Sequence, residues 1–87
     1  MARYRIVIKA SAAREIEEIS SRGDRRRVVD RIAALAEDPR PRGCEKLSGR
    51  DIYRIRQGPY RILYSLQDEQ LVVHVVKVGH RRDVYKG

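Results

Sequence analysis

The sequence is poor in the residues that build disulfides, metal sites and membrane segments. Its 87 residues include one cysteine, Cys44, and no tryptophan or phenylalanine. A single cysteine excludes a disulfide within the chain, and with His74 and His80 it has no spacing typical of a zinc site. The longest apolar run, residues 71–76, is interrupted by His74 and is too short to cross a bilayer. We therefore expect a cytoplasmic protein with no metal, no small-molecule cofactor and no membrane contact.

Acidic side chains are also scarce. The chain has 20 Lys and Arg residues against 12 Asp and Glu, which gives a formal net charge of +8 at pH 7. The hydrophobic share of 41% is that of a folded chain, and the length predicts a single domain over residues 1–87. Such a small domain has little room for a deep cavity, so we expect a functional site on its surface. The excess of positive charge favours an anionic partner.

The first half of the sequence predicts a strand and two helices. Residues 3–9 alternate between charged and apolar side chains, which is typical of a strand with one buried face. Two segments with apolar residues at helical spacing follow, the first capped by Ser11 and the second capped by Asp24 and stopped by Asp38 and Pro39. The apolar positions are Ala12, Ile16 and Ile19 in the first helix and Val28, Ile32, Leu35 and Ala36 in the second. The short link predicts an antiparallel helix hairpin.

After the proline-containing loop at residues 39–44, the hydrophobic period changes to two. Strands are predicted at residues 52–57, 60–66 and 71–78, with tight turns at Gly58-Pro59 and Asp68-Glu69. A weaker pairing segment lies around residues 45–47. The sequence thus predicts an α+β fold with an N-terminal strand, a two-helix hairpin and a three- to four-stranded antiparallel meander.

Two-residue turns would fix which residues face each other. Arg56 then lies opposite Arg61, and Tyr64 lies opposite Val73. One face of the meander becomes apolar, includes Leu71 and receives the helices. The other face gathers Arg54, Arg56 and Arg61, and we expect no Asp or Glu on it.

Arginines gathered in this way repel one another unless an anion lies between them. A guanidinium matches phosphate oxygens in a bidentate way, so the cluster favours phosphate binding. The alternative is that these arginines only keep an exposed sheet face soluble.

Two further basic segments are candidates for nucleic-acid contact. The second helix carries Arg25, Arg26, Arg27 and Arg31, which form either a solvated face or a patch for a large polyanion such as ribosomal RNA. In the ending HRRDVY, residues 80–85, Gly79 would let the chain turn out of the last strand and bring Arg81 and Tyr85 toward the arginine face. An aromatic ring beside arginines suits an unstacked RNA base, although Tyr85 is equally suited to be a hydrophobic anchor.

The hairpin YRIRQGPYRILY at residues 53–64 and the ending VGHRRDVY at residues 78–85 resemble the RelE/ParE superfamily of toxin–antitoxin toxins, most closely its RelE branch. The resemblance implies a RelE-like fold and a ribosome-dependent endoribonuclease, or mRNA interferase, that needs no metal. Such a toxin inhibits translation by cutting mRNA in the decoding site of the ribosome, and it is neutralised by a cognate antitoxin.

The resemblance also implies the site. Its catalytic residues would be Arg54, Arg56, Arg61, Arg81 and Tyr85, acting on a ribose 2′-hydroxyl that attacks the adjacent phosphate. Relatives often carry lysine at the positions of Arg54 and Arg56. Because arginine stays protonated, Tyr85 becomes the candidate base, with His80 as the alternative. The residues expected to bind RNA without chemistry are Arg25, Arg26, Arg27, Arg31 and Arg82.

Two other functions remain open at this point. A ParE-like toxin would share the architecture but inhibit DNA gyrase, and a non-catalytic module would only bind RNA or antitoxin. The arginine and tyrosine set favours the nuclease, because a gyrase inhibitor has no need of it. For the RelE-like toxin we expect an acidic, partly disordered antitoxin that covers the basic surface.

Overall fold

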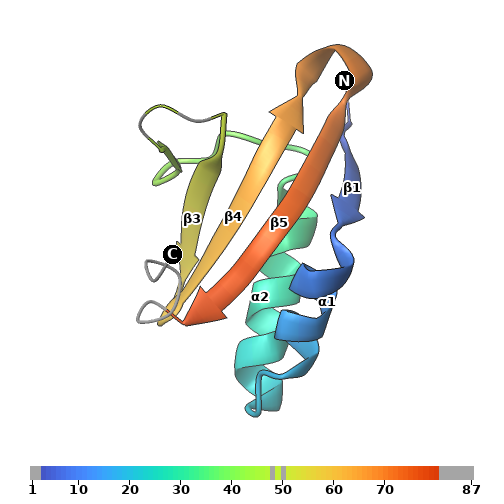
Figure 1. Cartoon of the computed structure of the whole chain (residues 1–87). Coiled ribbons are helices and arrows are strands. Elements are labelled where there is room, and N and C mark those ends of the chain that lie inside the picture. Colours follow the sequence, from blue (N-terminus) through green and yellow to red (C-terminus); the bar gives the residue numbers. More distant parts are fainter. Residues whose placement is uncertain (1–2, 48, 50, 81–87) are drawn as a thin grey trace.

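The structure is a computed structural model that describes residues 3–47, 49 and 51–80. Along the chain its elements are β1 (Arg5–Ile8), α1 (Ala10–Glu17), α2 (Arg22–Ala34), β2 (Glu45–Lys46), β3 (Tyr53–Gln57), β4 (Tyr60–Gln67), a 3₁₀ turn (Asp68–Gln70) and β5 (Val72–His80). Both helices pack against one face of the sheet (Figure 1). The α+β fold predicted from the sequence is confirmed. None of the helices in the described ranges is long and apolar enough to span a membrane.

The sheet has five strands in the order β1-β5-β4-β3-β2. The meander β2-β3-β4-β5 is antiparallel throughout, and the weak segment at residues 45–47 supplies its fourth strand. β1 runs parallel to β5 and pairs Arg5 with Val72 and Ile8 with Val75. The last strand therefore lies inside the sheet, between the first strand and the hairpin (Figure 1).

The apolar stripes predicted for the two helices are buried as expected. Their members Ala12, Ile16, Ile19, Val28, Ile32, Leu35 and Ala36 are all buried. From the sheet, the core receives the buried side chains of Ile55, Ile62, Tyr64, Val73, Val75 and Val78. Full burial of one such aliphatic side chain stabilises a fold by about 1.5–3 kcal/mol, so these contacts hold the helices on the sheet.

The helix boundaries differ from the prediction. Ser11 lies inside α1, which starts at Ala10, and the cap of α2 is Ser21, whose hydroxyl oxygen accepts a hydrogen bond from the Asp24 backbone N–H at 3.2 Å. The predictions of Ser11 and Asp24 as N-caps are therefore wrong. A serine three residues ahead of an acidic residue can cap the helix while the carboxylate favours the positive end of its dipole, and Ser21 and Asp24 have this spacing.

The turn between β4 and β5 is longer than predicted. Instead of two residues, it has a 3₁₀ turn followed by Leu71 in a left-handed conformation with φ 55°. Tyr64 consequently pairs with Val75 and not with Val73. A displacement of two residues leaves the side chains of Val73, His74 and Val75 on their expected faces, which is why the predicted core survives the error. Leu71 itself is exposed at the turn, so its assignment to the core is wrong.

A bulge and a longer β5 change the end of the sheet. Tyr64 pairs with Val75 but its neighbour Leu63 pairs with Lys77, so Val76 is an extra residue in β5. Beyond the bulge, β5 runs on to His80, with Gly79 inside the strand. The prediction that the chain turns out of the sheet at Gly79 is wrong.

At the opposite end of the sheet, an arginine joins the loop after α2 to the β4–β5 turn. The Arg40 guanidinium donates two hydrogen bonds to the Asp68 carboxylate, at 3.2 and 2.8 Å, and a third to the Tyr53 hydroxyl at 3.2 Å. Tyr4, just before β1, donates to the same carboxylate at 2.6 Å. The Arg40 guanidinium and the Tyr4 hydroxyl lower the pKa of Asp68. This group, the Arg40 clasp, connects four segments of the chain.

We expect the Arg40 clasp to make stability depend on pH. Because the folded pKa of Asp68 lies below its unfolded value of about 4, its contribution is complete above that value and is lost as the pH falls through the folded pKa. Asp68→Asn should lower the melting temperature at neutral pH, and the gap to the wild type should close on acidification to about pH 2. Thermal unfolding followed by circular dichroism measures the gap, with the exposed Asp51→Asn as control. A gap that is constant with pH would contradict the role of Asp68.

Candidate nucleic-acid interface

The first hairpin brings three arginines to one face of the sheet. The predicted register is confirmed, with Arg56 opposite Arg61 and Arg54 opposite Leu63. Because side chains alternate along a strand, these arginines point away from the face that carries buried Ile55 and the helices. We call Arg54, Arg56 and Arg61 the arginine cluster.

The three members of the arginine cluster have different surroundings. Arg56 is exposed near the β3–β4 turn. Arg61 is half-buried, its Nε atom is shielded from solvent, and its partner on β5 is Gly79, which has no side chain. Arg54 has a side chain only 11% exposed and lies 2.6 Å from the Oε2 atom of Glu45. The cluster thus ranges from a solvent-facing charge to a nearly buried ion pair.

The expectation of no acidic residue on this face is wrong. β2 pairs with β3 so that Glu45 lies directly opposite Arg54, and its carboxylate accepts a hydrogen bond from that guanidinium. With one partner nearly buried, the pair is screened less by solvent than a surface ion pair. Glu45 reduces the repulsion within the cluster before any ligand arrives. The sequence signal is the weak strand at residues 45–47, whose pairing with β3 is not fixed by the two-residue turns.

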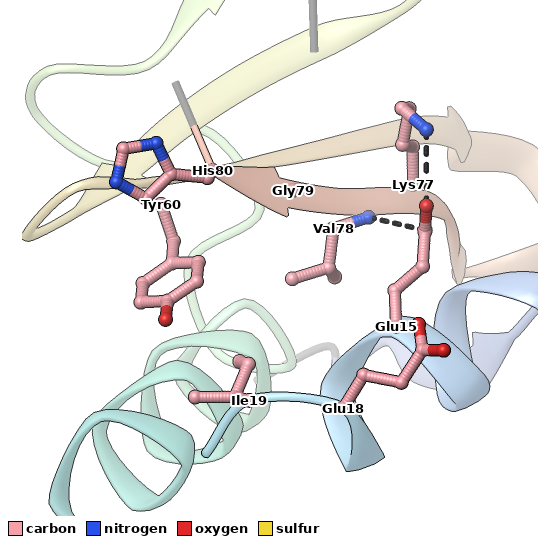
Figure 2. Close-up of a pocket in the computed structure, with 8 residues that line it drawn as sticks. All are labelled: Glu15, Glu18, Ile19, Tyr60, Lys77, Val78, Gly79 and His80. Carbon is pink, nitrogen blue, oxygen red and sulfur yellow. Dashed lines mark hydrogen bonds and ion pairs between the residues drawn. The ribbon is translucent and has the colours of Figure 1, made fainter. Parts of the chain in front are cut away.

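His80 lies on the other face of the sheet. It pairs with Tyr60, and the two rings meet edge to face with centroids 5.9 Å apart. Tyr60 and Arg61 are neighbours in β4 and point to opposite faces, so His80 shares the helix side with Tyr60 and not the side of the arginine cluster. There it borders a pocket of about 210 Å³ that Glu15, Glu18 and Ile19 also line (Figure 2). The structure does not bring the alternative base to the arginine cluster.

The basic patch on α2 is partly neutralised by its own helix. Arg27 pairs with Asp24 at 3.2 Å and Arg26 with Asp30 at 3.6 Å. Arg25 is half-buried and donates to the Ile19 carbonyl oxygen at 3.5 Å. Arg31, the fourth predicted member, is also half-buried. The patch therefore presents less net positive charge than its sequence suggests.

The remaining predicted site residues, Arg81, Arg82 and Tyr85, lie outside the described residues. Within the described ranges, no group of three or more His, Cys, Asp and Glu side chains has the arrangement of a metal site. Cys44 is a free, half-buried thiol that packs against the core. Its position agrees with a role in packing.

Comparison with known proteins identifies similar toxins. A family model described as the ParE toxin of the type II toxin–antitoxin system parDE matches residues 6–85. The toxin RelG of Mycobacterium tuberculosis is 41% identical over 34 residues, a stretch that spans 39% of this chain and 39% of RelG.

Two solved structures share the whole fold. The toxin–antitoxin complex RelBE2 of Mycobacterium tuberculosis aligns with a TM-score of 0.79 and 26% identity, over 91% of this chain and 99% of the other. The archaeal RelE–RelB complex of Pyrococcus horikoshii aligns with a TM-score of 0.78 and 26% identity, over 97% and 100%.

The Glu45–Arg54 pair leads to a prediction about anion binding. Glu45→Gln removes the negative charge beside the Arg54 guanidinium, so the variant should bind a single-stranded RNA oligonucleotide more tightly, with a salt slope steeper by about one phosphate contact. Fluorescence anisotropy at several salt concentrations measures both quantities. The control Glu69→Gln removes the same charge in the β4–β5 turn, at the far end of β4 from Arg61. Equal slopes for the two variants would exclude Arg54 from the interface.

Proposed function

Because the chain belongs to the RelE/ParE superfamily of type II toxin–antitoxin toxins, we propose that it is a ribosome-dependent endoribonuclease that cleaves mRNA in the decoding site. The observation that carries this proposal is the arginine cluster on the sheet face opposite the helices. Three guanidinium groups on adjacent strands suit a substrate with closely spaced phosphates.

The proposed reaction uses no metal and no small-molecule cofactor. A ribose 2′-oxygen attacks the neighbouring phosphorus as its proton leaves, and the bond from phosphorus to the 5′-oxygen breaks. The base takes the proton from the 2′-hydroxyl, and the leaving 5′-oxygen takes one from water. The products are a 2′,3′-cyclic phosphate and a 5′-hydroxyl, so atoms and charges balance. Arg61, half-buried on the proposed RNA-facing side, is assigned to the charge that develops on the phosphate. The ribosome would supply the alignment of the attacking and leaving oxygens.

Proton transfer is assigned to Tyr85. Arginine at positions 54 and 56 stays protonated and cannot accept a proton. His80 faces the helix side with Tyr60, which argues against it as the base. In this proposal Arg81 and Tyr85 complete the catalytic set, and Tyr85 also offers a ring on which an RNA base can stack.

Docking to the ribosome is assigned to the α2 patch. Arg26 and Arg27 are exposed, and their aspartate partners lie on the same solvent-facing part of α2. Phosphates of ribosomal RNA could replace these partners at little cost, because exposed ion pairs are weak. Arg25, Arg31 and Arg82 would add to the same long-range attraction without taking part in chemistry.

The proposed inhibitor is a cognate antitoxin. The RelBE2 and archaeal RelE structures are both complexes with an antitoxin. On this chain, β1 is an edge strand with exposed Val7 and Ile8, and Val29 is exposed on α2 nearby. Between them lies an apolar groove of about 160 Å³ lined by Ile6, Ile8, Ile16, Val29, Ile32 and Ala33. An acidic antitoxin segment with apolar anchors would match both this groove and the +8 charge.

A ParE-like inhibitor of DNA gyrase is the second candidate, because the matching family model is described as a ParE toxin. The two candidates separate in one experiment. The nuclease produces new mRNA 5′ ends at translated codons after induction, whereas a gyrase inhibitor changes the supercoiling of plasmid DNA and leaves mRNA intact.

Variants at two positions test the nuclease chemistry. Arg61→Ala should lower the single-turnover cleavage rate on programmed ribosomes by roughly 100-fold, or about 3 kcal/mol, while ribosome binding is retained. Lysine at this position should restore part of the rate. Tyr85→Phe keeps the ring and removes the proton acceptor, so the rate should fall while RNA binding persists.

The control for these variants is Arg42→Ala, which removes an exposed arginine from the loop before β2. It should cleave at the wild-type rate. Wild-type rates for both Arg61→Ala and Tyr85→Phe would contradict the nuclease proposal, and so would equal cleavage of free RNA and of RNA on ribosomes.

The groove beside β1 gives a separate prediction. Val29→Glu places a negative charge among apolar side chains, so affinity for the antitoxin should fall by at least about 10-fold, as expected for an unpaired charge facing an apolar anchor. Isothermal titration calorimetry with the purified antitoxin measures the loss. Val29→Ala, which keeps the surface apolar, should lose less. Unchanged affinity in Val29→Glu would place the antitoxin elsewhere on the toxin.

A further inference from the structure

The outer edge of β5 loses its partner strand halfway along. β1 pairs with β5 only from Val72 to Val75, and the last bond between them runs from the Lys9 N–H to the Val75 carbonyl oxygen at 2.9 Å. β5 continues to His80. Backbone N–H groups on this uncovered length lie beside α1 and need another acceptor.

Glu15 of α1 supplies that acceptor. Its Oε1 atom accepts a hydrogen bond from the Val78 backbone N–H at 2.9 Å, and its Oε2 atom accepts one from the Lys77 Nζ atom at 3.0 Å (Figure 2). The side chains of Glu15 and Lys77 are 27% and 39% exposed, so solvent screens the pair less than a surface pair. We call this arrangement the Glu15 latch. It replaces β1 on the last part of β5.

The bulge in β5 makes the latch possible. Before the bulge, the carbonyl oxygens of Leu71 and Val75 accept hydrogen bonds from the β1 side, so the backbone groups of odd-numbered residues point toward β1. Because Val76 is an extra residue, the backbone groups of even-numbered residues point to that side after the bulge, and the Val78 N–H therefore points toward Glu15. The same reversal buries the Val78 side chain in the core. Bulge and carboxylate together set the position of this strand end.

The latched strand end borders the arginine cluster. Gly79, the residue after Val78, is the β5 partner of Arg61, and Arg81 follows His80 directly in the sequence. A change in the position of Val78 therefore moves Gly79, the β5 backbone beside Arg61, and also His80, the residue that precedes Arg81. Displacement by about 1 Å can cost up to 100-fold in rate when a catalytic group must be aligned.

We propose that Glu15 is a positioning residue for RNA cleavage, which acts through Val78 and Gly79 on Arg61 from the opposite side of the sheet. The inference rests on the proposed nuclease function. Glu15 touches no RNA in this proposal. Its loss should affect the chemical step and leave ribosome binding unchanged.

Three substitutions separate the parts of the latch. Glu15→Ala removes both contacts, Glu15→Gln keeps an acceptor for the Val78 N–H, and Lys77→Met removes only the ion pair. Glu15→Ala should lower the single-turnover cleavage rate by at least about 10-fold, with ribosome affinity within about twofold of the wild type. Glu15→Gln should restore most of the rate. Amide hydrogen exchange at Val78 should accelerate in Glu15→Ala and stay slow in Glu15→Gln.

Two controls distinguish positioning from general destabilisation. Glu18→Gln changes a carboxylate that lines the same pocket, and it should leave both rate and exchange unchanged. Ile16→Val weakens core packing next to Glu15 without touching the latch, and it should keep its rate wherever it is fully folded.

Wild-type cleavage by Glu15→Ala, or an equal loss of rate in Ile16→Val, would overturn the positioning role alone. A wild-type protein that cleaves no RNA would overturn the proposed function, and the positioning role with it. A loss of ribosome binding by Glu15→Ala as large as its loss of cleavage rate would also overturn the positioning role.

Discussion

The pairing of β4 with β5 is the contact on which the rest of the structure depends. β4 holds the first hairpin and β5 holds β1, so together these two strands determine the position of every other strand. Their inner face supplies Ile62, Tyr64 and Val75 to the core. Their outer face carries Arg61 beside Gly79. The bulge at Val76 lets one strand pair serve both purposes, because beyond it Val78 faces the core and Gly79 lies opposite Arg61.

Most of the helices, strands and core residues could be predicted from the sequence, because the period of hydrophobic residues is a local property. Ile16 and Ile32 repeat at helical spacing, while Ile55 and Ile62 alternate as in a strand, and all four are buried. The register of the first hairpin also followed from its two-residue turn. A shift in strand pairing by two residues keeps each side chain on the same face of the sheet. The error in the length of the turn before Leu71 therefore changed few of the predicted core residues.

What the sequence did not yield depends on contacts between distant segments. Glu45 meets Arg54 only if a strand of two residues pairs with β3, and so short a strand has no hydrophobic pattern of its own. Glu15 lies 62 positions before Lys77, and nothing in the helix indicates that its carboxylate meets a strand end. His80 lies on the helix side because β5 continues as far as His80 and the extra residue Val76 reverses which side chains face the helices. In each case the missing information was tertiary geometry, while the residue types were visible from the start.

The parallel pairing of β1 with β5 has a consequence for synthesis of the chain. Arg5 of β1 can pair with β5 only after Val72 has been synthesised. The sheet therefore combines one of the first segments of the chain to be made with one of the last. Helices and hairpins can form as they emerge, but a contact between such distant segments is slow to form and closes the fold late. A nascent chain that ends before residue 72 lacks β5, so its sheet is incomplete and Arg61 has no neighbouring strand on that side. For a protein proposed to act on ribosomes, this topology would keep each new copy inert on the ribosome that makes it.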